Sequence, residues 1–275
     1  MHNMLKELRR DKLAVIALVL LGVIFLMAIV GPYLAPFDPI TQNLHERRLG
    51  PSLVHWLGTD EFGRDILSRL ILGSRNTLFI GFLSVAIGLS IGCVLGVIAG
   101  YYGGFADSCI MRAMDLMLAY PYFLLALLIV ATLGPGMTNS TIAIGIASVP
   151  TYSRVVRSSV MALKGSLLVK AEEALGATDW RIIILHVAPN VFAPVIVVAT
   201  LGVASAVLGG AALGFLGLGA QPPTPEWGVM LSGGRSYLID APHIALAPGI
   251  ALALLVVSCN LFGDTLRDIL DPKLK

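Results

Sequence analysis

The chain has 275 residues, of which 56% are hydrophobic and 13% are charged, and its mean hydropathy is +0.85. Soluble domains carry roughly a quarter of charged residues, so this composition excludes an ordinary soluble domain and indicates a membrane protein. The formal net charge of +2 predicts neither a nucleic-acid partner nor an acidic one.

Six apolar stretches are each close to the roughly 20 residues that a helix needs to cross a bilayer. The first is longer than a signal-peptide core of roughly 7 to 15 residues, so we expect a retained anchor. We therefore predict an all-α polytopic membrane protein with six transmembrane helices. The stretches lie at residues 13–35, 77–100, 115–134, 139–161, 189–215 and 244–263.

Lysine and arginine residues set the predicted orientation. With a cytoplasmic N-terminus, the inner segments hold thirteen of the nineteen Lys and Arg residues, as the excess of positive charge inside requires. We expect four parts, and both termini in the cytoplasm. These are the N-terminus with the first helix at 1–36, an outer loop at 37–76, a core at 77–265 with a cytoplasmic loop at about 162–189, and a cytoplasmic tail at 266–275.

The outer loop contains two charge pairs at helical spacing. Glu61 and Arg64 are three residues apart, and Asp65 and Arg69 are four apart. This spacing predicts an exposed helix with weak surface ion pairs at 60–69. We favour simple solvation of these charges over peptide binding, and the docking of an external binding protein is a further alternative.

Small residues recur at every fourth position in two of the predicted spans. Such ridges let helices approach closely, and close contact is what stabilises helix pairs in a bilayer. We therefore predict a tightly packed bundle. The ridges are Ser84, Gly88, Gly92, Gly96 and Gly100 in the second span, and Gly202, Ala206, Gly210 and Gly214 in the fifth.

The spans have few ionisable groups. Proton-driven carriers and voltage sensors keep such groups within the membrane, so we expect energy to enter elsewhere. The chain also has no G-x-x-x-x-G-K-[ST] loop, so another subunit would have to bind ATP. An ion-coupled secondary transporter is the alternative, because an unwound stretch at 209–219 could bind sodium. We expect Arg154 and Arg157, near the inner end of the fourth span, to reach lipid phosphates.

Residues 168–190 carry five charges between two long apolar runs. The spacing of Ala171, Ala174 and Leu175 predicts a short helix with a small apolar face. Gly176 would end that helix, and Thr178 would cap a second helix that starts at Asp179. The spacing fits two roles equally well: a solvated connector, or a knob that docks in a groove on a cytoplasmic partner.

Residues 220–228, AQPPTPEWG, contain three prolines, which predicts a stiff outer loop. We expect Trp227 in this loop to lie at the level of the lipid headgroups.

The inner segment resembles the EAA loop of bacterial ABC-importer permeases, in which Glu-Ala-Ala precedes three residues, a Gly, an apolar stretch and a Pro. Ala171, Gly176, the apolar run 182–185 and Pro189 match this pattern. The sequence departs from it at Lys170, which stands in place of the glutamate, and at Glu172, which stands in place of the second alanine.

Four further segments resemble the dipeptide/oligopeptide/nickel branch of these permeases, and most of all its second, C-type subunit. They follow the family order and cover most of the chain. They are PSLVHWLGTDEFGRDILSRL at 51–70, YYGGFADSCIMRAMDLMLAYP at 101–121, GFLGLGAQPPTPEWGVML at 214–231 and NLFGDTLRDILDPKLK at 260–275.

The resemblance implies a non-enzymatic subunit of the bacterial inner membrane, with an N-terminal anchor and a five-helix permease core. Its implied partners are a homologous permease in a heterodimer, two ATP-binding cassette subunits that hold ATP and magnesium, and an extracytoplasmic substrate-binding protein. The implied cargo is a dipeptide or oligopeptide; nickel or another metal chelate, glutathione and haem are the alternatives. No cofactor, metal ligand or nucleic-acid partner is implied for this chain.

The resemblance also implies that the inner segment couples the permease to its ATPases. The expected contact residues are Ala171, Glu172, Glu173, Ala174, Leu175, Gly176, Ala177, Thr178, Asp179 and Trp180. The sequence identifies no residue that binds the cargo.

Overall fold

The structure is a computed structural model that describes residues 12–270. Residues 1–11 of the predicted cytoplasmic N-terminus and residues 271–275 of the predicted tail lie outside this range. Within it, every regular element is a helix, and the only strand-like pairing is a bridge between Thr59 and Asp65. The prediction of an all-α protein is confirmed.

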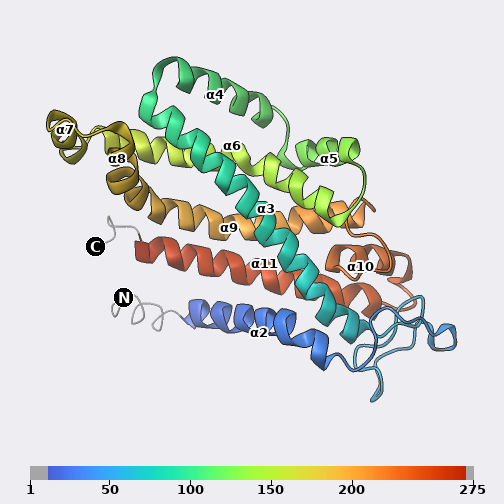
Figure 1. The fold of residues 1–275 in the computed structure, drawn as a ribbon. Helices are drawn as coiled ribbons and strands as arrows, with labels where there is room; N and C mark the ends of the chain where they lie inside the picture. Colours follow the sequence, from blue (N-terminus) through green and yellow to red (C-terminus); the bar gives the residue numbers. More distant parts are fainter. Residues whose placement is uncertain (1–11, 271–275) are drawn as a thin grey trace.

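Five long helices run side by side along the length of the bundle (Figure 1). We refer to the two ends of this bundle as the α7 end and the α10 end. The loop at 35–65 lies at the α10 end, whereas α2 begins and α11 ends at the α7 end. The long helices are α2 (Lys12–Leu34), α3 (Ile66–Tyr102), α6 (Met137–Lys164), α9 (Ala188–Phe215) and α11 (His243–Leu270).

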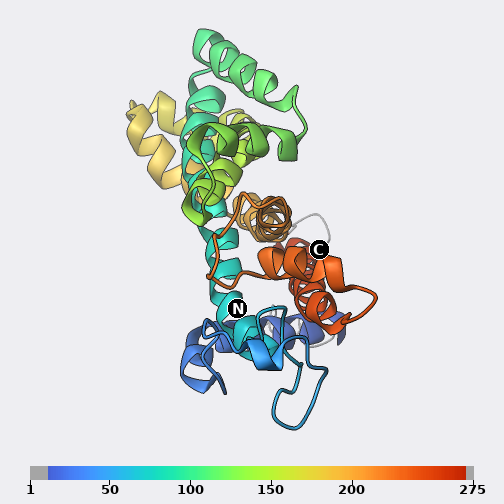
Figure 2. The ribbon, with the colours of Figure 1, turned by 90° about the vertical axis from the view of Figure 1, so that its right-hand side faces the viewer.

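Shorter helices connect and flank these five. Figure 2 looks at the bundle from the α10 end, with α2 and α4 on opposite sides and α3 crossing from one to the other. The short helices are α4 (Gly104–Leu118), α5 (Tyr122–Leu133), α7 (Leu167–Ala174), α8 (Asp179–Ile182) and α10 (Trp227–Gly234), with single turns η1 (Leu44–Glu46), η2 (Ile183–Val187) and η3 (Arg235–Tyr237).

Four helical stretches are long and apolar enough to cross a membrane: Lys12–Gly31, Ile66–Tyr102, Asp179–Phe215 and His243–Leu270. The α4–α5 pair is a fifth candidate, bent by 90°. Helix α6 has 28 residues and is long enough, although it contains two arginines. Counted with α6, these six units are roughly consistent with the predicted count. The unit formed by α4 and α5 is bent because α4 ends at Leu118 and a new helix, α5, starts after Pro121.

Helix α3 begins at Ile66, so residues 66–76 of the predicted outer loop are helical. Asp65 caps this helix, since the Ser68 backbone N–H donates to its Oδ2 over 2.7 Å. The loop between α2 and α3 therefore comprises residues 35–65.

The predicted exposed helix at 60–69 is wrong for residues 60–65, which are not helical, whereas residues 66–69 are the start of α3. Residues 60–64 form a tight turn, and Asp60, Arg64 and Arg69 are only 4–6% exposed. The Asp60 carboxylate closes the turn because it accepts the backbone N–H groups of Phe62 and Arg64. Its Oδ2 also lies 2.7 Å from Arg64 Nε and 3.3 Å from Arg69 Nε. Asp65, the predicted partner of Arg69, instead contacts His55 Nδ1 at 2.9 Å.

The predicted small-residue ridges bring helices into close contact, as expected. The Gly92 and Gly96 ridge of α3 lies against α6: a Cβ built on Gly92 would be 2.6 Å from Tyr152 Cβ, and one on Gly96 would be 2.7 Å from Ser153 O. The α9 ridge behaves in the same way, since a Cβ on Gly210 would be 2.6 Å from Ile80 Cγ2. Only glycine permits these approaches.

Trp227 is fully buried, so the prediction of a headgroup anchor is wrong. Its indole Nε1–H donates to Leu70 O over 2.9 Å, which joins α10 to α3. The preceding residue, Glu226, is also fully buried and caps α10, because its carboxylate accepts the N–H groups of Gly228 and Val229. Burial raises the pKa of this carboxyl, and these backbone hydrogen bonds act in the opposite direction.

We predict that Gly92→Ala destabilises the protein, because its Cβ would overlap the Tyr152 side chain and push α3 from α6. Overpacking of this kind costs about 1–3 kcal/mol. Thermal unfolding in detergent measures the effect. Gly22→Ala in α2 is the matched control, since no atom lies within 4 Å of its Cβ. Equal unfolding temperatures for the two variants would contradict the packing argument.

Candidate functional site

Residues 167–182 form a helix, a turn and a second helix. Ser166 caps α7, since its Oγ accepts the Val169 N–H over 3.4 Å. Helix α7 ends at Ala174, and Gly176 then takes a φ of +79°. The backbone N–H of the following residue, Ala177, donates to Glu172 O over 3.0 Å. This is how glycine commonly ends a helix, and the predicted stop at Gly176 is confirmed.

The second helix, α8, begins at Asp179 as predicted. Thr178 occupies the cap position in an extended conformation, but its side chain makes no capping hydrogen bond, so that part of the prediction is wrong. The neighbouring Asp179 is exposed, and its Oδ1 accepts a hydrogen bond from Tyr101 OH over 3.2 Å. Helix α8 continues through the π-helical turn η2 into α9.

A separate apolar cluster attaches this segment to the bundle. Val169 of α7, Ile182 of α8 and Val187 of η2 are at most 1% exposed. They pack with residues at the ends of α3 and α6, among them Tyr101 and Val160. The segment is therefore seated on three long helices, α3, α6 and α9, and is not a loose connector.

Beyond this cluster, the segment projects from the α7 end of the molecule (Figure 1). Leu175 is 83% exposed and Trp180 is 71% exposed, and nothing lies within 4 Å of a Cβ built on Gly176. Ala171 and Ala174 are exposed as well. The ten predicted contact residues thus form one projecting knob, Ala171 to Trp180, with an apolar surface that no described residue covers.

One acidic side chain of the knob, Glu172, contacts a residue of the same chain. Glu172 Oε1 lies 3.3 Å from His186 Nε2, which ties α7 to η2. Glu173 and Lys170 are exposed. His186 was not predicted as part of this site, because nothing in the sequence pattern links two residues that are 14 positions apart and separated by a turn.

Two ion pairs close to this end join α6 to α4. Arg157 Nε lies 2.5 Å from Asp107 Oδ1, and Arg154 Nη2 lies 2.5 Å from Asp115 Oδ1. The prediction that these arginines reach lipid phosphates is wrong. The amphipathic helix α4 supplies an acidic partner for each of them, and such charge-assisted hydrogen bonds are stronger than neutral ones.

A cavity of about 360 Å³ lies between α5, α6 and α9. Hydroxyl groups line it, and none of its lining residues is charged. The sequence analysis named no residue here, since isolated Ser, Thr and Tyr residues in apolar spans carry no distinctive pattern. The hydroxyls belong to Tyr122, Ser148, Thr151, Tyr152 and Ser205. Among residues 12–270, no group of three or more His, Cys, Asp and Glu side chains could hold a metal ion.

Two family models match the chain. The binding-protein-dependent transport system inner membrane component matches residues 92–275, and the N-terminal TM domain of oligopeptide transport permease C matches residues 1–51. The dipeptide transport system permease protein DppC of Alkalihalophilus pseudofirmus is 48% identical over 98% of this chain and 89% of its own length. The glutathione transport system permease protein GsiD of Pectobacterium atrosepticum is 43% identical over 97% and 89%.

Solved structures share the fold. A chain of the MetNI methionine ABC transporter in an inward-facing conformation superposes with a TM-score of 0.59 at 19% identity, and covers 74% of this chain and 97% of its own. A chain of an amino acid ABC transporter with histidines gives a TM-score of 0.55 at 16% identity, with coverages of 73% and 92%. The chain therefore belongs to the binding-protein-dependent permeases of ABC importers, in their C-type dipeptide and oligopeptide branch.

Proposed function

We propose that this permease subunit imports dipeptides or short oligopeptides. The observation that carries this proposal is the similarity at 48% and 43% identity, over nearly the whole chain, to two permeases named for dipeptide transport. The family consists of membrane subunits of transporters, not of enzymes. Relatives named for glutathione, itself a short peptide, have similar identities, so a peptide is the cargo class that agrees with both sets.

The hydroxyl-lined cavity between α5, α6 and α9 supports a path for such a cargo. Peptides differ in their side chains but share backbone amides, which Ser, Thr and Tyr hydroxyls can bind as donors or acceptors. An uncharged lining also avoids the cost of an unpaired ionised group within the membrane. In this proposal a second, homologous permease closes the path from the other side.

The proposed orientation has the α7 end and both termini in the cytoplasm, and the α10 end facing outward in the bacterial inner membrane. The excess of Lys and Arg on the inner segments supports it. Two ATP-binding cassette subunits then sit below the α7 end and hold ATP and magnesium, and an extracytoplasmic binding protein delivers cargo to the α10 end. In this proposal, the permease chain itself binds no cofactor.

The knob at Ala171 to Trp180 is the proposed contact with an ATPase subunit. It projects into the cytoplasm in this orientation, and its exposed Leu175 and Trp180 offer the kind of apolar anchors that bind in a partner's groove. Since Val169 and Ile182 are buried against α3 and α6, a push on the knob would move these helices together.

Transport of a dipeptide tests the proposed cargo. The chain assembled with its partner permease, ATPases and binding protein in liposomes should take up radiolabelled alanyl-alanine when ATP is present, and not with a non-hydrolysable analogue. A metal chelate or haem serves as the comparison cargo. ATP-driven uptake of one of these, with none of alanyl-alanine, would overturn the peptide assignment.

Gly176→Val is expected to uncouple transport from ATP hydrolysis. The φ of +79° costs a residue with a side chain about 1–2 kcal/mol, so the turn would shift and displace the knob. Peptide uptake should fall several-fold while ATP hydrolysis by the assembled complex persists.

The matched control is Gly165→Val, one residue before the cap of α7. Gly165 has a φ of −74°, which suits any residue, and the nearest atom to its Cβ is 3.7 Å away. This variant should transport normally. Normal uptake by Gly176→Val as well would contradict a coupling role for the turn.

Leu175→Ser should weaken the binding of the ATPase subunits by about tenfold, because it removes an apolar anchor. A titration of purified ATPase against the permease pair measures this affinity. Leu53→Ser provides the control, since Leu53 is 97% exposed but lies in the outer loop. Equal affinities for both variants would place the ATPase contact elsewhere.

A further inference from the structure

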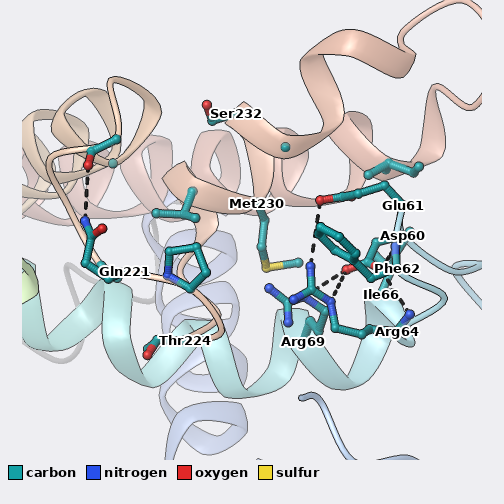
Figure 3. Close-up of a pocket in the computed structure, with 17 residues that line it drawn as sticks. Asp60, Glu61, Phe62, Arg64, Ile66, Arg69, Gln221, Thr224, Met230 and Ser232 are labelled. Atoms are coloured by element: carbon teal, nitrogen blue, oxygen red, sulfur yellow. Dashed lines mark hydrogen bonds and ion pairs between the residues drawn. The ribbon is translucent and has the colours of Figure 1, made fainter. Parts of the chain in front are cut away.

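A second cavity, of about 320 Å³, opens at the α10 end of the bundle (Figure 3). It lies between the turn at 60–64, the start of α3, the loop at 217–224 and helix α10. Its volume is at the lower end of the roughly 300–1,000 Å³ that small-molecule sites occupy. Gln221 on its lining is exposed, so the cavity is accessible from outside the bundle.

Four charged side chains line this cavity. The hydrogen-bonding groups of two of them, Asp60 and Arg69, are occupied by contacts within the chain. Asp60 accepts two backbone N–H groups and faces both arginines. Arg69 donates from Nη1 to Pro39 O over 2.8 Å and contacts Asp60 through Nε at 3.3 Å. These two residues hold the outer loop onto α3 and are therefore structural.

The other two, Arg64 and Glu61, keep unused hydrogen-bonding groups. Among residues 12–270, neither terminal nitrogen of Arg64 donates a hydrogen bond, although this residue is only 6% exposed. Its Nη2 lies 3.8 Å from Glu61 Oε1, which is too far for a hydrogen bond. The Glu61 carboxylate accepts no hydrogen bond from that part of the chain either.

The Arg64 guanidinium and the Glu61 carboxylate thus line one cavity without a hydrogen bond between them. The terminal nitrogens of Arg64 are not among the buried side-chain atoms that lack a partner, and Glu61 is only partly buried, so both groups reach the cavity surface and can form hydrogen bonds to a ligand there. The Glu61 carboxylate lies beside α10 at a glycine, because a Cβ on Gly233 would be 3.1 Å from its Oε1. Figure 3 shows Glu61 pointing toward the arginines, with Met230 forming an apolar wall beside them.

We propose that this cavity binds a short zwitterionic peptide, with the peptide carboxylate on Arg64 and its ammonium group on Glu61. A carboxylate can accept hydrogen bonds from both terminal nitrogens of a guanidinium. The peptide ammonium group would donate directly to the Glu61 carboxylate, whose contact with Arg64 Nη2 is only a loose one at 3.8 Å. That the zwitterion is a peptide rests on the proposed function, whereas the need for both charges rests on Arg64 and Glu61. In the proposed orientation, the site receives cargo at the outer mouth.

The test measures binding to the permease pair with its ATPases in nanodiscs, without the external binding protein. The probes are alanyl-alanine, N-acetyl-alanyl-alanine, which lacks the ammonium group, and alanyl-alanine amide, which lacks the carboxylate. For the wild type, each change should weaken binding about tenfold or more, as loss of a charged hydrogen bond does. In Glu61→Gln, acetylation should cost nothing further while amidation keeps its full effect.

Glu61→Gln suits this test because the carboxylate makes no hydrogen bond that the fold needs, and gel filtration confirms its assembly. The matched control is Asp240→Asn, an exposed acid of the 238–242 loop at the same end, which should bind all three probes like the wild type. An acetylation penalty in Glu61→Gln as large as in the wild type would overturn the assignment. Absence of alanyl-alanine binding would also overturn it, while ATP-driven dipeptide uptake by the complete importer would leave the proposed function standing.

Discussion

The close approach of α3 to α6 is the constraint on which the rest of the structure depends. Without a hydrophobic driving force between helices in lipid, stability comes from backbones that nearly touch, and a Cβ on Gly92, Gly96 or Gly100 would be 2.6–2.8 Å from atoms of α6. This contact fixes the tilt of α3 across the bundle (Figures 1 and 2). The tilt in turn brings one end of α3 to the knob and the other end to the turn at 60–64.

Charged groups gather at the two ends of the bundle, and several of them are paired within the chain. At one end Asp60 holds Arg64 and Arg69, and at the other α4 provides an acid for each arginine of α6. The cavity between the two ends is lined by hydroxyl and apolar groups, and none of its lining residues is charged. This division suits a path through which a charged cargo passes, because ionised groups in the middle would bind it too tightly to release it.

Periodicity in the sequence was sufficient for the helices, the ridges and the stop at Gly176, since each depends on local spacing. It was insufficient wherever a distant residue decides the outcome. Trp227 is buried because Leu70 O accepts its indole N–H, and Arg157 is held by Asp107, which is 50 positions away. The charges at 60–69 fit a helical pattern, but Asp60 can also bind backbone N–H groups, and it closes a turn instead.

Helix α6 connects the knob to the middle of the bundle. Its last turns, with Val156 and Val160, pack in the apolar cluster beneath α7 and α8. Two turns earlier, Tyr152 lies against Gly92 of α3 and Gly202 of α9, and its hydroxyl lines the central cavity. Because close-packed contacts do not compress, a displacement of the knob cannot be absorbed between these points. A shift of α6 against its glycine contacts would therefore change the cavity wall directly.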